Sequence, residues 1–249
     1  MKNAFAPRTP LPSRVSRVPA YRLAPILACA ALFWLGALPA SAQAQPPAGG
    51  FAPPIAPLLP TPQAKPPAWL AFEHAWANIT AYSTTVTTFE QEGTRTQTWV
   101  FDYTFRKPTS ATVHYNKGPN AGVTAVWNGG NAVSVHRSGL LAVFKKTFAL
   151  HDPTVTTIRG SSIDQLSFAA IISHAQDTPG TVSEGPGPTI LGIPTESVAL
   201  IPNSAVADTG LTHEVVDIST MTSLPLRVLG FDGETLVRQV DFADIKLEH

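Results

Sequence analysis

Apolar and polar positions alternate along residues 98–108, "TWVFDYTFRKP". Trp99, Phe101, Tyr103 and Phe105 occupy every second position, with Thr, Val and Asp residues between them. Successive side chains of a strand point to opposite faces, so the four rings would share one face. The segment is therefore predicted to be a strand with one aromatic face.

Two other segments have the period of a helix. In "PAWLAFEHAWANITAYS", residues 67–83, apolar side chains recur at intervals of three and four from Trp69 to Ile79. The segment "SSIDQLSFAAIISHAQ", residues 161–176, has a comparable pattern and begins with serines that can cap a helix. Both segments are predicted to be helices that each bury one face.

Most of the remaining chain is rich in β-branched residues that are separated by Gly and Asn turns, of which Asn128-Gly129-Gly130-Asn131 and Asp232-Gly233 are the clearest. A Gly- and Pro-rich loop is expected at 177–194. Short turns between consecutive strands indicate an antiparallel meander. The predicted fold class is α+β: a curled antiparallel sheet, a half-barrel of about ten strands, covered by two or more helices. The predicted strands lie near 83–92, 95–106, 110–116, 122–128, 131–137, 140–145, 196–201, 211–219, 225–231 and 234–247.

The N-terminal region has the layout of a secretory signal peptide. Five basic residues and no acidic residue precede an apolar run at 24–40, and "ASA" at 40–42 follows. Cleavage after Ala42, with Ala44 as the alternative, places the mature protein in the periplasm. Two alternatives are retention as a membrane anchor and lipidation at Cys29, which follows "ILA".

Residues 43–67 are rich in Pro and Ala and are predicted to be an extended linker, which leaves 68–249 as one domain. Loss of residues 1–42 would remove the single cysteine and leave 12 basic against 17 acidic residues, a net charge of −5. Disulfides and thiolate metal sites are then excluded, and nucleic acid is not an expected partner.

Motifs for catalysis are missing from the sequence. It contains no "GxSxG", "GxxxxGKS" or "HExxH", and its histidines are scattered among different predicted elements. The nearest approach is "HEVVD" at 213–217, which is interpreted as the solvated polar residues of a strand. No enzymatic activity, cofactor or metal site is predicted.

Basic and acidic residues are unevenly distributed. Residues 93–160 hold eight basic residues and two acidic ones, whereas 161–249 hold three basic and twelve acidic. One interpretation is that the basic half and the acidic half of a sheet pair with each other across its surface. The other is a basic rim that approaches an anionic lipid head group or membrane.

The order of these elements, with "TTFEQEG" in the first strand, "FRKP" at the end of the aromatic strand and "VWNGGN" at a turn, resembles the periplasmic LolA/LolB-like superfamily of lipoprotein carriers. In that superfamily a strand ends in an Arg-Pro pair, a turn contains Asp-Gly, and a late segment has the form "LPxR…dG". Lys107 stands between the two residues that match the Arg-Pro pair. The matching residues are Arg106, Pro108, Asn128, Gly129, Leu224, Pro225, Arg227, Asp232 and Gly233.

The resemblance implies a half-barrel with an apolar cavity that takes acyl chains, and hence a role in the binding or sorting of outer-membrane lipoproteins. The partner would be a lipid or a lipoprotein acyl chain, with an envelope membrane protein as a further possibility, and the protein would be a monomer. Arg106 and Lys107 are the expected rim or lid contacts. The expected lining consists of Trp99, Phe101, Tyr103, Phe105, Val113, Tyr115, Val123, Trp127, Val133 and Val135.

Two other functions remain open. An envelope sensor or scaffold could use the same fold to bind a protein partner, with the Pro-rich linker extending from an uncleaved anchor. A secreted hydrolase is the third possibility.

Overall fold

The computed structural model describes residues 64–117, 120–137 and 145–249. The predicted signal peptide, most of the predicted linker and nearly all of the predicted strand at 140–145 lie outside these residues. Among the helices that are described, none has the length and apolarity needed to cross a lipid bilayer.

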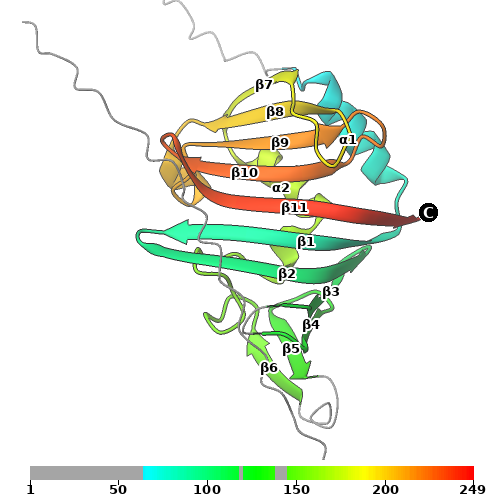
Figure 1. The fold of residues 1–249 in the computed structure, drawn as a ribbon, viewed down its shortest axis with the longest axis vertical. Helices are drawn as coiled ribbons and strands as arrows, with labels where there is room; N and C mark the ends of the chain where they lie inside the picture. The colour runs from blue at the N-terminus through cyan, green and yellow to red at the C-terminus, as the bar shows by residue number, and fades with distance from the viewer. Residues whose placement is uncertain (1–63, 118–119, 138–144) are drawn as a thin grey trace, which may run out of the picture. The chain divides into compact units, whose positions relative to one another are not determined.

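The described residues contain eleven strands that form one antiparallel sheet in the order β6-β5-β4-β3-β2-β1-β11-β10-β9-β8-β7 (Figure 1). The predicted class, an α+β open half-barrel, is confirmed, with eleven strands instead of about ten. Each neighbouring pair is consecutive in the chain except β1 and β11, which join the two halves. The strands are β1 (Ala81–Glu92), β2 (Arg95–Arg106), β3 (Ser110–Tyr115), β4 (Val123–Trp127), β5 (Ala132–Arg137), β6 (Lys145–Ala149), β7 (Gly180–Pro186), β8 (Thr195–Pro202), β9 (His213–Ser219), β10 (Pro225–Asp232) and β11 (Thr235–Glu248).

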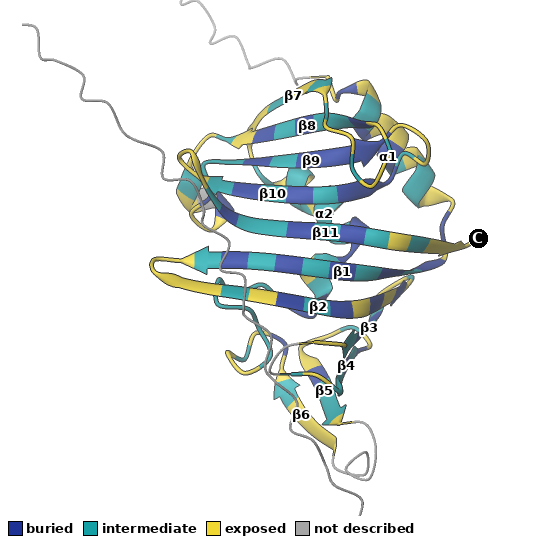
Figure 2. Ribbon diagram, viewed as in Figure 1, coloured by how far each residue is buried: buried dark blue, intermediate teal, exposed yellow. Residues whose placement is uncertain are grey.

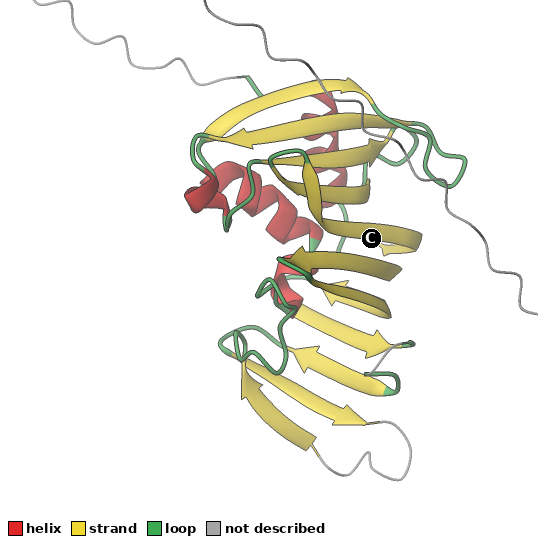
Figure 3. Cartoon of the chain, turned by 60° about the vertical axis from the view of Figure 1, so that its left-hand side comes forward, coloured by secondary structure: helices red, strands yellow, loops and turns green. Residues whose placement is uncertain are grey.

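The helices lie on the concave side of this sheet (Figure 3). They are α1 (Pro67–Ala77), α2 (Phe168–Asp177) and two short 3₁₀ helices, η2 (Ile163–Leu166) and η3 (Ala205–Asp208). Alternate strand residues face the helices, and these are the buried ones, as the banded colouring of β1 and β2 in Figure 2 shows. The one-sided aromatic pattern of β2 therefore faces the helices.

Three element predictions differ from the structure. The first helix ends at Ala77 instead of continuing to 83, because Asn78 caps it and the strand β1 begins at Ala81 between β2 and β11. The second predicted helix is divided, since the Ser167 side chain accepts a hydrogen bond from Ala170 N at 3.0 Å and starts α2 there. The expected loop at 177–194 contains the strand β7.

The interior between α1, α2 and the sheet is filled by aromatic rings. Phe168 stacks on Tyr82 with 4.2 Å between ring centroids and 4° between planes, and it also contacts Phe72, Trp76 and Phe242 edge-on. Phe168, Phe72, Tyr82 and Phe242 are all buried. Side chains from both helices and both sheet halves thus form one core.

Candidate functional site

The residues predicted to line a cavity all come together on the concave face of β2–β5. The strand registers pair Phe101 with Tyr115, Tyr103 with Val113, and Trp127 with Val133. Buried members of the predicted set are Trp99, Phe101, Tyr103, Phe105, Val113, Trp127 and Val133, and half-buried members are Tyr115, Val123 and Val135.

Part of this set surrounds a small apolar cavity, here called the aromatic pocket. It lies between β1–β5 and the segment 155–166, has a volume of about 30 Å³, and is lined by Trp99, Phe101, Val113, Tyr115 and Val133 together with Ile163 and Leu166. This volume holds about one or two water molecules. An acyl chain could enter only if the segment that covers the pocket moved.

Other members of the set pack against helices. Tyr103 donates a hydrogen bond from its hydroxyl to the carbonyl of Ile163 at 3.3 Å, and Phe105 contacts Trp76 at 5.7 Å between ring centroids. Both side chains are buried. In this structure they hold η2 and α1 against the sheet.

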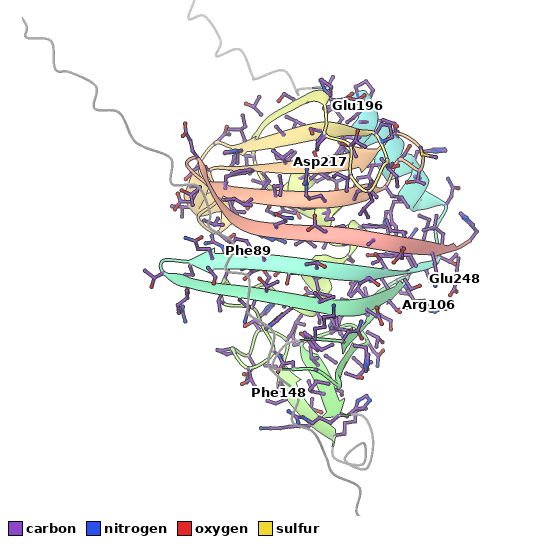
Figure 4. All side chains as sticks on the ribbon, in the orientation of Figure 1. Phe89, Arg106, Phe148, Glu196, Asp217 and Glu248 are labelled. Carbon is purple, nitrogen blue, oxygen red and sulfur yellow. The ribbon has the colours of Figure 1, made fainter. Side chains whose placement is uncertain are left out.

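The predicted rim residues also make contacts within the protein. Arg106 forms an exposed ion pair with Glu248 at 2.8 Å, and Figure 4 shows both at the same end of β2 and β11. Lys107 donates to the carbonyl of Trp76 at 2.6 Å and lies 4.1 Å from the centre of its ring. A cation at the end of α1 is favoured by the helix dipole, so Lys107 fastens this helix.

A larger cavity lies on the other half of the concave face, under α2. This polar cavity has a volume of about 270 Å³, close to the lower limit of small-molecule sites. Its wall is partly apolar, with Ile171, Val216 and Val228, and partly charged. The charged residues are Arg159, His174, Asp208, Glu214 and Arg238.

Four elements bring together four of the charged groups of the polar cavity, here called the charged cluster: His174, Asp208, Glu214 and Arg238. His174 Nε2, on α2, lies 3.0 Å from Asp208 Oδ1 on η3 and 2.8 Å from Glu214 Oε2 on β9. Arg238 Nη1, on β11, lies 3.4 Å from Glu214 Oε1. The two carboxylate side chains are each only 3% exposed, so their charges depend on these partners.

The same contacts shift the titration of the cluster. Hydrogen bonds to Asp208 and then Glu214 raise the pKa of His174 to about 10, against the opposing effect of burial. Burial acts to raise the pKa of Glu214, but the bond from His174 and the nearby charges outweigh it and lower that pKa. His174 is therefore an imidazolium at neutral pH, and it ties α2 to η3 and β9.

The donor atoms of His174, Asp208 and Glu214 all lie within 4.8 Å of one another. Such a set could accept a divalent cation, since imidazole nitrogen and carboxylate oxygen are common ligands. A protonated His174 fulfils the same electrostatic role, because one positive group contacts both carboxylates.

The sequence did not indicate this cluster, because its members are separated by up to 64 positions and only the fold joins them. The interpretation of "HEVVD" as solvated was wrong for Glu214 and Asp217. Glu214 is 2% exposed on the concave face, and Asp217 is 1% exposed on the opposite face, where it pairs with Arg227 at 2.8 Å. Glu214 shares the face of Val216 and Ile218. A charged residue on this apolar face of the strand was the feature of the sequence that could have indicated a buried charge.

Solved structures with a similar chain fold include a putative outer membrane lipoprotein-sorting protein domain from Vibrio parahaemolyticus, with 10% identity, a TM-score of 0.37, and coverage of 72% of this chain and 91% of that one. The lipoprotein LppX from Mycobacterium tuberculosis has 15% identity, a TM-score of 0.41, and coverage of 73% and 91%. A LolA superfamily protein from Nitrosomonas europaea has 9% identity, a TM-score of 0.34, and coverage of 73% and 94%.

These matches concern the chain fold alone. No protein-family model matches the sequence, and no curated protein matches it significantly.

Proposed function

We propose that this chain is a non-enzymatic periplasmic protein, monomeric and exported by a cleaved signal peptide, that binds or carries the acyl chain of a lipid or lipoprotein on the concave side of its sheet. The observation that supports this proposal is that one short segment, 161–166, separates hollows that otherwise adjoin.

Segment 161–166 lines three hollows on the concave face. Ser161 and Gln165 line the polar cavity, and Ser161, Ile163 and Leu166 line the aromatic pocket. A third hollow of about 10 Å³, beside Gln165 and Leu166, also adjoins Val228, Val240 and Phe242 of the sheet. Outward movement of the segment would join these spaces into one channel that is apolar at the aromatic pocket and ends at the charged residues of the polar cavity.

Hydrogen bonds hold the segment and the residues just before it, in addition to the bond from Tyr103 to Ile163 and the buried side chain of Ile163. The buried Glu90 carboxylate accepts a bond from Arg159 N at 3.0 Å and from Ser161 Oγ at 2.8 Å. Gln97 Oε1 accepts a bond from Ile158 N at 3.1 Å. An entering acyl chain gains about 0.8 kcal/mol for each CH₂ group that leaves water, so a chain of ordinary length can offset the loss of these bonds.

The proposal can be tested with the purified mature protein. Lipid extraction and mass spectrometry should detect a co-purified acyl compound, and the neutral probe N-phenyl-1-naphthylamine should bind with a rise in fluorescence. Ala170 lines the polar cavity, so Ala170→Trp should fill it and weaken probe binding about tenfold or more.

Thr94→Trp is the matched control, because Thr94 lies in the exposed turn between β1 and β2. This variant should bind the probe like the wild type. Absence of both co-purified lipid and probe binding would refute the proposal, as would equal binding by Ala170→Trp and the wild type.

A further inference from the structure

The charged residues of the polar cavity differ in how many hydrogen-bond and ion-pair partners they have within the protein. Arg238 lies on the concave face of β11, paired in register with Glu90 on one side and Gly230 on the other. A Cβ atom at Gly230 would lie 3.2 Å from Arg238 Cβ and 3.0 Å from Leu211 Cδ1. The missing side chain at this position leaves room for Arg238 to lie over β10 toward Glu214.

Carboxylates around Arg238 are already occupied by other groups. Glu214 Oε2 and Asp208 Oδ1 both contact His174, and Glu90 accepts bonds from Arg159 N and Ser161 Oγ. The remaining contact of Arg238, from Nη1 to Glu214 Oε1, is 3.4 Å long. Ion-paired hydrogen bonds of this type are usually about 2.7–2.9 Å.

The two arginines of the polar cavity therefore have hydrogen-bond donors that are not matched by carboxylate acceptors among the described residues. Arg238 Nε is buried and has no hydrogen-bond partner within the described part of the chain. The Arg159 guanidinium donates only to backbone carbonyls, of Gln91 at 3.1 Å and of Thr209 at 3.3 Å, with no carboxylate within ion-pair distance among the described residues. Arginine presents five donors in a planar fork that suits carboxylate and phosphate oxygens.

We infer that the polar cavity binds an oxyanion, the carboxylate or phosphate head of an acyl amphiphile, at Arg238 with Arg159 as a second donor. The inference rests on the proposed function and adds the chemical class of the head group. The apolar wall formed by Ile171, Val216 and Val228 then receives the first part of the acyl chain.

Displacement of bound N-phenyl-1-naphthylamine tests the inference at neutral pH. Decanoic acid and decyl phosphate are compared with methyl decanoate, which has the same chain without the charge, and inorganic phosphate is added alone. Wild-type protein should prefer the two anions over the ester about tenfold or more. If inorganic phosphate weakens decanoate binding but leaves the probe in place, the site binds a free oxyanion. If phosphate has no effect, the site binds the head group only as part of an amphiphile.

Variants separate this inference from the proposed function. Arg238→Gln should abolish the preference for anions, measured as the ratio of decanoate to ester affinity, whereas Arg238→Lys should retain part of this preference. Arg159→Gln, which should reduce the preference, provides a second variant if Arg238→Gln does not fold. Arg106→Gln is the control, since Arg106 is exposed and pairs with Glu248 outside this cavity.

The inference would be overturned if Arg238→Gln and Arg159→Gln both folded and kept the preference for anions. It would also be overturned if decanoic acid and methyl decanoate displaced the probe from the wild type equally. Either result would leave the proposed function intact. Loss of all probe and ester binding in the wild type would instead refute the proposed function.

Discussion

His174 is the residue on which the charged cluster depends, since among the described residues it is the one cation that contacts both Asp208 and Glu214. Without it, Glu214 would keep only the long contact to Arg238, and Asp208 would have no cationic partner within the described part of the chain. A buried carboxylate without a partner is costly, so the protonation of His174 contributes to the stability of the fold.

We expect His174→Gln to destabilise the protein in a pH-dependent manner. The pKa of His174 is raised from 6.5 to about 10, so its contribution is complete below about pH 6.5 and is lost as pH rises through 10. The variant should lose roughly 1–2 kcal/mol in free energy of unfolding at pH 6.5, a value reduced for solvent screening because the side chain is 37% exposed. Urea unfolding at pH 6.5, 8 and 10.5 measures the difference.

His74→Gln is the control for this measurement, because His74 is exposed on α1. The difference between His174→Gln and wild type should shrink toward pH 10.5, whereas His74→Gln should track the wild type throughout. A difference that stays constant with pH would contradict the raised pKa.

At the residue scale, the sequence revealed which side chains share a face but not how much space lies between them. Alternation placed Trp99, Phe101, Tyr103 and Phe105 on one face, as the structure has them. The positions of the helices that fill the space opposite these rings depend on contacts between residues far apart in sequence, such as Tyr82 with Phe168.

At the scale of elements, α2 is held at its two ends by different interactions. Phe168 anchors its first turn among the aromatic rings, and His174 anchors its last turn to the charged cluster. Segment 161–166, immediately before α2, is held both by hydrogen bonds, from Ser161 to Glu90 and from Tyr103 to the carbonyl of Ile163, and by the buried side chain of Ile163.

Phe168→Ala should lower the free energy of unfolding by about 3–5 kcal/mol, since it removes a fully buried ring that contacts four others. Phe148→Ala is the matched control on the edge strand β6, where the ring is half-buried, and it should cost about 1 kcal/mol or less. Chemical denaturation of the two variants provides the comparison. Equal losses would show that Phe168 does not organise the core.

Glu90→Gln should loosen segment 161–166 without unfolding the sheet. The substitution keeps the shape of the side chain but turns an NH₂ group toward a neighbouring donor, because Glu90 accepts bonds from both Arg159 N and Ser161 Oγ. Hydrogen exchange should become faster at residues 158–163 and remain unchanged in β9, and binding of N-phenyl-1-naphthylamine should increase.

Glu92→Gln controls for the loss of one charge on the same strand, since Glu92 is exposed and pairs with Arg95 at the hairpin. Exchange at 158–163 should be unaffected by this variant. If Glu90→Gln also left it unaffected, Glu90 would not be what holds the segment.

Element prediction was successful where a face is buried and failed where it is not. β8, β9 and β10 alternate or are continuously apolar, and their positions match within two residues. β7 is largely exposed at the sheet edge and contains Gly180, Gly185 and Pro186, so its sequence resembles a loop. Only its backbone pairing with β8 makes it a strand.

At the scale of the whole molecule, the pairing of β1 with β11 holds the two halves of the sheet together. Val86 of β1 lies between Phe101 of β2 and Phe242 of β11, so this seam runs through the centre of the core. The predicted meander accounts for the consecutive pairs from β1 to β5 and from β8 to β11, but not for β7 with β8, because β7 was expected to be part of a loop. The central position of β1 and β11 did not follow from it, because no local turn connects them.

Truncation after Gln239 should abolish cooperative folding, because it removes Val240, Phe242 and most of the backbone pairing of β1 with β11. Removal of His249 alone is the control, since this residue is exposed. Near-ultraviolet circular dichroism and thermal melting distinguish the two. A sharp melting transition in the longer truncation would show that the half-sheet β1–β6 folds by itself.

The pairing of β1 with β11 also determines when, during synthesis of the chain, the domain can fold. Strand β1 precedes every other described strand in the chain, but one of its two neighbours is completed only when residue 248 has been added. Folding therefore waits for the entire domain, since the long-range pairing must close the sheet. Under the proposed export by a signal peptide, this delay would keep the domain unfolded until its last strand has been made.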